Sequence, residues 1–238
     1  MSSNKAAKAN PERGQVLRQA LSVSVATGLY GISFGALSIA AGLSLAQTIA
    51  LSALMFTGGS QFAFISVIGA GGSPLAAIAT ASLLGVRNGL YGVQLGPLLN
   101  LRGWRRLAAA QVTIDESTAV ATAQTTERLR RSGFWWTGIG VFLGWNALTF
   151  VGALVGNALG DPKVWGLDAA AAAAFLGLLW PRLASRSAQA CAGIAVVIAC
   201  LLIPFAPAGL PVLAAATAAI LVGAYEARRK TADGEEND

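Results

Sequence analysis

The sequence has no histidine, two cysteines and few charged residues. Without histidine, the chain cannot form a histidine proton relay, a histidine-dependent metal site or a Ser-His-Asp triad. Cys191 and Cys200 lie in one apolar run, about 13.5 Å apart along a helix, which is too far for a disulfide. No Gly-x-x-x-x-Gly-Lys motif occurs, so this chain alone is not expected to pump with ATP.

Charged residues make up 12% of the chain, about half the fraction usual in a soluble domain, whereas 55% of the residues are hydrophobic. The mean hydropathy is +0.60. The apolar residues form long Ala/Leu/Gly-rich runs and lack the alternation of a β-barrel. The sequence therefore predicts an all-α, polytopic transmembrane helical bundle. Its formal charge of +6 collects at the ends of the runs, which does not suggest a nucleic-acid site.

The charges also predict three regions. Residues 1–20 carry a basic excess and are expected to be a cytoplasmic N-terminal segment, a solvated tail rather than a short interfacial helix. No cleavable signal is evident in them. Residues 21–226 are expected to form the transmembrane transport domain, and residues 227–238 a cytoplasmic C-terminal tail.

The number of crossings is open at this point. Three full crossings before Arg102, Arg105 and Arg106 would place these arginines outside, against the positive-inside rule. Either one interrupted segment re-enters without crossing, or residues 107–126 cross as well. These alternatives predict six and eight crossings, and seven is disfavoured. Broken or re-entrant helices in the first half are favoured, because irregular backbone is tolerated where it lines a cavity.

Two apolar runs are interrupted by residues that are costly in lipid, at 56–62 and 85–91. An arginine at the centre of a membrane costs roughly 2.5–3.5 kcal/mol on insertion scales, so it indicates a function. We expect the two interruptions to face one another and form the permeation site. A helix that starts at the glycine pair would present its N–H groups to a carboxylate, and the arginine would bind it as well. The predicted substrate-binding residues are Gly58, Gly59, Ser60, Gln61, Arg87, Asn88 and Tyr91.

Structural alternatives accompany each of these residues. Gly58 to Gln61 are equally explained by close packing of small residues, and Arg87 by an internal ion pair with one of three acids. Those acids are Asp115, Glu116 and Asp168, and they are also the predicted proton-coupling residues, because burial favours the neutral form of a carboxyl. Acids at a helix start on the cytoplasmic surface, or a helix cap at Asp168, are the simpler explanations. In the first apolar run, Gly31 and Gly35 form a small-xxx-small pair, which predicts a face for close helix packing. A short similarity between residues 34–37 and 151–154 suggests an internal repeat.

Several motifs follow one another in an order that resembles the AzlC family, the large subunit of bacterial two-component branched-chain amino acid exporters. They are YGISFG (30–35), GLS (42–44), FTGGSQF (56–62), GVRNGLY (85–91), DE (115–116) and GLD (166–168). The resemblance extends from about residue 16 to residue 183. It implies a multi-pass permease of the bacterial inner membrane that exports valine, leucine, isoleucine and similar amino acids. It also implies a small partner of about four helices called AzlD. We expect no cofactor and no enzyme activity.

The chain departs from the family pattern at three places. Asn88 stands where the family commonly has histidine, and Gly59-Ser60 stand where it has two alanines. Ala169 replaces a phenylalanine that often follows Gly-Leu-Asp. The leading hypothesis is a proton-coupled secondary transporter subunit. The alternative is a membrane channel or a scaffold that does not transport, and an intramembrane enzyme is disfavoured because no nucleophile and base are visible.

Overall fold

The computed structural model describes residues 2–159, 176–177, 179–180 and 183–235. Every regular element in these ranges is a helix, which confirms the predicted all-α membrane bundle. Three helical stretches of the described residues are long and apolar enough to cross a membrane, namely 12–40, 127–158 and 210–228. The helices are α1 (Ser2–Ala40), α2 (Leu45–Leu54), α3 (Gly59–Gly69), α4 (Pro74–Leu99), α5 (Trp104–Gln111), α6 (Asp115–Thr122), α7 (Glu127–Leu159), α9 (Arg186–Leu202), α10 (Leu210–Ala215) and α11 (Thr217–Glu235).

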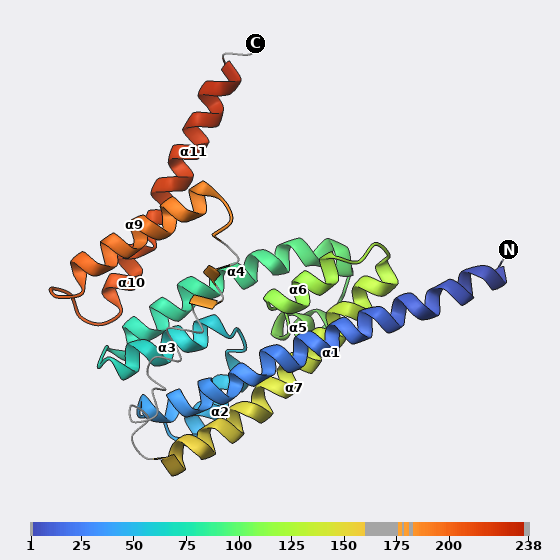
Figure 1. Cartoon of the computed structure of the whole chain (residues 1–238), viewed down its shortest axis with the longest axis horizontal. Coiled ribbons are helices and arrows are strands. Elements are labelled where there is room, and N and C mark those ends of the chain that lie inside the picture. Colours follow the sequence, from blue (N-terminus) through green and yellow to red (C-terminus); the bar gives the residue numbers. More distant parts are fainter. Residues whose placement is uncertain (1, 160–175, 178, 181–182, 236–238) are drawn as a thin grey trace.

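The long helices α1 and α7 lie side by side and form the backbone of the bundle (Figure 1). Glycines permit their close approach: a Cβ on Gly31 would stand 2.7 Å from the carbonyl oxygen of Trp145, and one on Gly35 or Gly152 would collide with backbone of the opposite helix. The predicted packing face at Gly31 and Gly35 is thus confirmed. The two echoing segments, 34–37 and 151–154, meet at this crossing.

Contacts between α1 and α7 advance in the same direction along both helices. Gly28 lies at Gly144, Gly31 at Thr149 and Gly35 at Ala153, so the helices run parallel. If both cross the membrane, the chain between them must return through it an odd number of times. This arrangement agrees with the alternatives of six and eight crossings and disagrees with three full crossings before α7.

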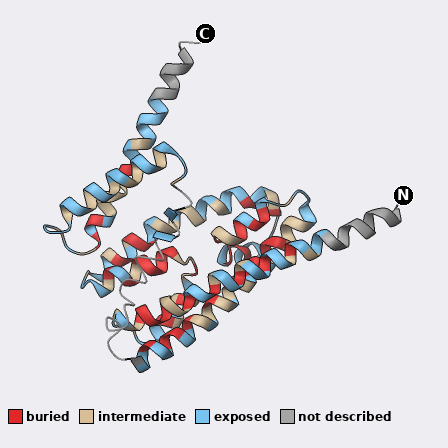
Figure 2. Cartoon of the chain, in the orientation of Figure 1, coloured by how far each residue is buried: buried red, intermediate tan, exposed pale blue. Residues whose placement is uncertain are grey.

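The N-terminal residues are helical and form the first turns of α1. The helix begins at Ser2, and Val16 and Ala20 are 3% and 2% exposed. Val16 packs near Gly133 of α7 and Val120 of α6. Burial continues along the α1/α7 contact, as the red segments in Figure 2 show.

The second apolar run is a broken helix, as predicted. Ser44 caps α2 in a reciprocal capping box with Gln47, and α2 ends at Leu54. After residues 55–58 the chain starts α3, with Gly58 at φ +60°, a backbone conformation that favours glycine. The two helices have 10 and 11 residues, so each is about 15–17 Å long and covers roughly half of a 30 Å hydrocarbon core.

The third run is not broken, and the prediction of a second interrupted helix at 85–91 is wrong. α4 is continuous from Pro74 to Leu99 through Arg87 and Asn88. Its Ser73 cap and Pro74 at the first turn define its start, and the left-handed Asn100 follows its end. The polar side chains leave the helix backbone intact because they find partners on neighbouring segments.

A second break lies elsewhere, in the polar stretch after α4. α5 and α6 have eight residues each and are separated by residues 112–114. In α6 the hydroxyl of Ser117 accepts from the N–H of Ile114 at 3.0 Å and donates to the carbonyl of Val112 at 2.7 Å, which fixes the turn. The stretch is therefore neither one interfacial helix nor one continuous crossing.

The C-terminal helices α9, α10 and α11 pack mainly on one another and meet the α3–α4 hairpin at one end (Figure 1). A Cβ on Gly209 would stand 3.0 Å from the Cβ of Ala76 and 3.1 Å from Val67. This contact fixes the start of α10 against the turn between α3 and α4.

Candidate functional site

A small cavity lies where the two breaks meet. Its volume is about 70 Å³, which is room for about five water molecules at 10–15 Å³ each. Residues of the first break form one wall, the start of α6 forms another, and α1, α4 and α7 complete it. The lining residues are Thr27, Tyr30, Phe56, Thr57, Gly58, Gly59, Phe62, Arg87, Ile114, Asp115, Glu116, Val141 and Trp145.

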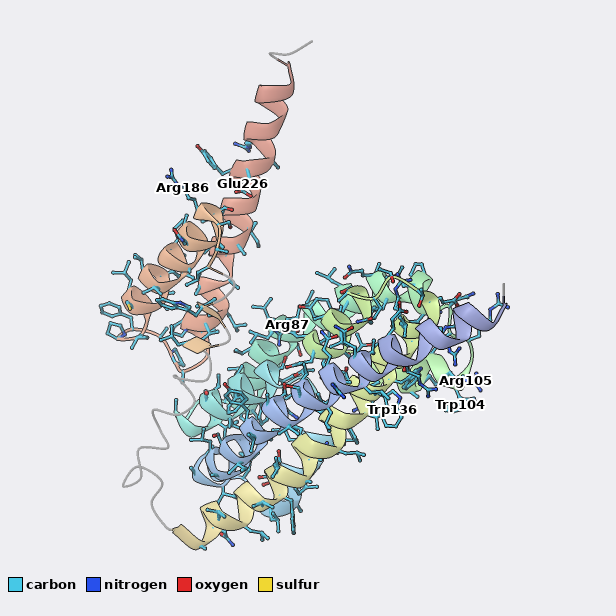
Figure 3. All side chains as sticks on the ribbon, turned by 45° about the vertical axis from the view of Figure 1, so that its right-hand side comes forward. Arg87, Trp104, Arg105, Trp136, Arg186 and Glu226 are labelled. Carbon is cyan, nitrogen blue, oxygen red and sulfur yellow. The ribbon has the colours of Figure 1, made fainter. Side chains whose placement is uncertain are left out.

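Arg87 connects both breaks from the continuous helix α4. Its Nη1 lies 2.9 Å from Oδ2 of Asp115 at the start of α6. Its Nη2 donates to the carbonyl oxygen of Thr57 in the first break, at 3.4 Å. The internal ion pair that the sequence left open is therefore present, with Asp115 as the acid. Figure 3 shows Arg87 within the bundle.

Gly59 is small because Arg87 occupies the space beside it. A Cβ there would stand 3.0 Å from Nη2 of Arg87. The predicted meeting of the glycine pair with Arg87 is thus observed, although the second partner is an intact helix. Within the described residues, no side chain caps the start of α3, which leaves its first N–H groups without a side-chain acceptor.

Glu116 is the second acid of the cavity. It accepts a hydrogen bond from the hydroxyl of Thr27 on α1, at 3.3 Å. Among the described residues, no lysine or arginine lies within 4.0 Å of its carboxylate. Glu116 therefore differs from Asp115, whose charge is balanced by Arg87. Asp168, the third predicted acid, lies outside the described residues.

The other predicted binding residues do not line the cavity. Gln61 is fully buried, and its amide donates to the carbonyl oxygens of Leu51 and Ser52, both at 3.1 Å, which joins the end of α2 to α3. Asn88 donates to the carbonyl of Thr113 in the second break, at 3.1 Å. Ser60 is buried, and Tyr91 is half-buried one turn beyond Arg87.

The apolar side of the cavity is aromatic. Phe34 packs edge-on against Phe62 with ring centroids 5.6 Å apart, and it stacks on Trp145 at 5.9 Å. Two buried donors at the cavity, the indole N–H of Trp145 and the hydroxyl of Thr57, have no hydrogen-bond partner among the described residues. Such groups are available to a ligand.

Sequence reasoning missed several lining residues, including Thr27, Tyr30, Phe56, Ile114 and Trp145. Thr27 and Tyr30 flank Gly28 and Gly31, and these glycines bring α1 against α7. The position of Thr27 and Tyr30 beside these glycines could therefore have identified them from the sequence. The break at 112–114 gave no comparable signal, because it contains neither glycine nor proline.

These features define a helical membrane protein in which two broken helices surround a cavity with charged and aromatic walls. Residues 22–159 match the family described as AzlC protein, and the chain belongs to this family. It is also similar to the "Inner membrane protein YgaZ" of Escherichia coli (strain K12), with 32% identity over 158 residues. That match covers 63% of this chain and 61% of the relative's length. No solved structure matches the chain significantly.

Proposed function

We propose that the chain is the large subunit of a secondary transporter that exports branched-chain or other hydrophobic amino acids, driven by the proton gradient, across the bacterial inner membrane. The cavity between the two breaks carries this proposal. It combines Arg87, Asp115 and Glu116 with an aromatic wall, and it lies among helices too short to cross a membrane alone. Unwound segments beside a central site are a common device of secondary transporters.

The substrate carboxylate is proposed to bind the open N–H groups at Gly58 and Gly59. Arg87 contributes to the same site through its Nε–H, a buried donor that has no hydrogen-bond partner among the described residues. The aliphatic side chain would lie against Phe62 and Trp145. In such an apolar pocket, one methylene more or less changes the discrimination between two substrates by only about 1–3 kcal/mol. A range of apolar amino acids is therefore the expected substrate class.

Glu116 is proposed as the proton carrier, since no arginine in the described part of the chain pairs with its carboxylate. Asp115 is proposed to assist it indirectly, because protonation of Asp115 would weaken the hold of Arg87 on the second break. In this way proton uptake would loosen the contacts through which α4 holds α6 and the glycine pair. Asp168, which the sequence also predicts as a proton-coupling residue, is proposed as a third candidate for this role.

The observed cavity is too small for a leucine, which has more heavy atoms than the cavity has room for water molecules. Transport therefore requires a wider conformation. The two breaks are the expected hinges, because residues between helices absorb changes in backbone angle. The proposed partner is a small AzlD-like membrane protein of about four helices, and both chain termini are proposed to be cytoplasmic.

The test uses bacterial cells that lack the gene for this chain, loaded with a leucine-containing dipeptide. Hydrolysis of the dipeptide raises internal leucine, and its efflux is followed with and without the restored gene. We expect faster efflux when the gene and that of the small partner are both present. Equal efflux in all strains would reject amino acid export.

The runner-up function is a channel or a scaffold without transport activity. The Arg87–Asp115 pair favours it, because the pair satisfies the main charges of the site internally. In that case efflux would be unchanged by the gene, while loss of the chain would lower the amount of its partner in the membrane. Quantifying both proteins and efflux in the same cells separates the two functions.

A further inference from the structure

A groove unrelated to the central cavity lies between α5 and the first turns of α7. It is open on one side and has a volume of about 730 Å³. Tryptophans and arginines dominate its lining, with Trp104 and Arg105 from α5 and Arg131, Trp135 and Trp136 from α7. Figure 3 shows Trp104, Arg105 and Trp136 at the same end of the bundle.

The arginines of this groove differ in how far their charge is balanced. Arg131 is paired with Glu127 at 2.8 Å and donates from Nε to the carbonyl of Leu99 at 3.0 Å. Arg105 lies over the ring of Trp104, with its guanidinium carbon 5.9 Å from the ring centroid. No carboxylate of the described chain lies within 4.0 Å of Arg105. Its charge therefore remains available to an anion.

Trp136 also lines a second groove of about 510 Å³ between α1 and α7. On α7 this groove extends to Gly140, Gly144 and Leu148, and on α1 it includes Leu21 and Val25. From residue 136 to 148 a helix rises about 18 Å, which compares with about 15 Å for one leaflet of the hydrocarbon core.

We propose that these two grooves, which share Trp136, bind one anionic phospholipid. Arg105 holds the phosphate, the tryptophans lie at the level of the headgroup, and an acyl chain follows the α1/α7 groove past Trp136. Guanidinium groups suit phosphate, and tryptophan prefers the membrane interface. The positive lining selects an anionic headgroup over a zwitterionic one, as basic sites at helix ends do. Arg102, just before α5, and Arg106, in the first turn of α5, are both exposed and add to the positive potential.

Native mass spectrometry of the full-length protein tests this site. The purified protein is given equal amounts of dioleoyl phosphatidylglycerol and dioleoyl phosphatidylcholine. We expect one phosphatidylglycerol to be retained in preference. Arg105→Gln should lower its retention about fivefold, the effect of one charge near a membrane surface. Arg186→Gln removes the same charge at the distant start of α9 and should leave retention unchanged.

Four results would overturn the proposal. The first is equal retention of both lipids, and the second is an equal loss in the two arginine variants, since either would indicate unspecific attraction. The third is displacement of the bound lipid by millimolar inorganic phosphate, which would identify a site for a free anion. If the co-purified partner subunit excludes the lipid in wild type but not in Arg105→Gln, the groove is a protein interface instead.

Discussion

At the scale of single residues, Arg87 is the side chain on which the site depends. It contacts Asp115 in the second break and the Thr57 carbonyl in the first, while its neighbour Asn88 binds the Thr113 carbonyl. Two neighbouring residues of α4 thus bind residues of both breaks. This explains how an arginine can be retained in an apolar helix without interrupting it.

Removing one partner of the Arg87–Asp115 pair should destabilise the protein more than removing both. The two side chains are 31% and 22% exposed. We therefore expect a coupling free energy of roughly 1–3 kcal/mol between them, which lies between the values for exposed and for buried ion pairs. Thermal unfolding of Arg87→Gln, Asp115→Asn and the double variant in detergent measures it. Strictly additive losses would show that the pair contributes nothing.

Glu116 has a different expected role. Glu116→Gln should abolish efflux driven by a pH gradient, because glutamine cannot carry a proton, while exchange of leucine for leucine continues. Both rates are measured in membrane vesicles with radiolabelled leucine. Glu127→Gln is the control, since Glu127 is an exposed acid on α7 that pairs with Arg131. Gradient-driven efflux at the wild-type rate in Glu116→Gln would exclude Glu116 as the carrier.

At the scale of the helices, the α1/α7 contact is the least tolerant part of the fold. Gly152→Ala should lower stability by about 1–3 kcal/mol or prevent folding, because its Cβ would collide with the backbone of Ile32. Gly89→Ala on α4 should be neutral or slightly stabilising, since nothing lies within 4 Å of that position. Yields and melting temperatures of the two variants provide the comparison.

The sequence predicted the elements whose signals are local. The glycine spacing at Gly31 and Gly35 identified the packing face, and Gly58-Gly59 identified the first break. Prediction from the sequence failed where contacts between distant segments determine whether a helix is continuous or broken. Arg87 was taken as a helix interruption because its partner Asp115 is distant in sequence, and the break at 112–114 is fixed by Ser117, whose hydrogen bonds the composition does not reveal.

At the scale of the whole molecule, the parallel arrangement of α1 and α7 constrains the path of the chain. Both helix starts lie toward the same end of the bundle, and Arg105 of α5 lies at that end too (Figure 3). We therefore expect a cysteine at position 103 to face the cytoplasm. In a background without Cys191 and Cys200, Gly103→Cys should resist an impermeant thiol reagent in intact cells and react after permeabilisation. Reaction in intact cells would contradict this orientation.

The central claim is that the cavity between the breaks binds an apolar amino acid. Its most direct test is protection of a cysteine placed in the cavity by Thr57→Cys, again without Cys191 and Cys200. Thr57 lines the cavity and its hydroxyl has no hydrogen-bond partner in the described structure, whereas Thr122 at the exposed end of α6 lies outside it. Saturating leucine should slow alkylation of Thr57→Cys at least tenfold and leave Thr122→Cys unchanged. Alkylation of Thr57→Cys at the same rate with and without leucine would contradict the claim.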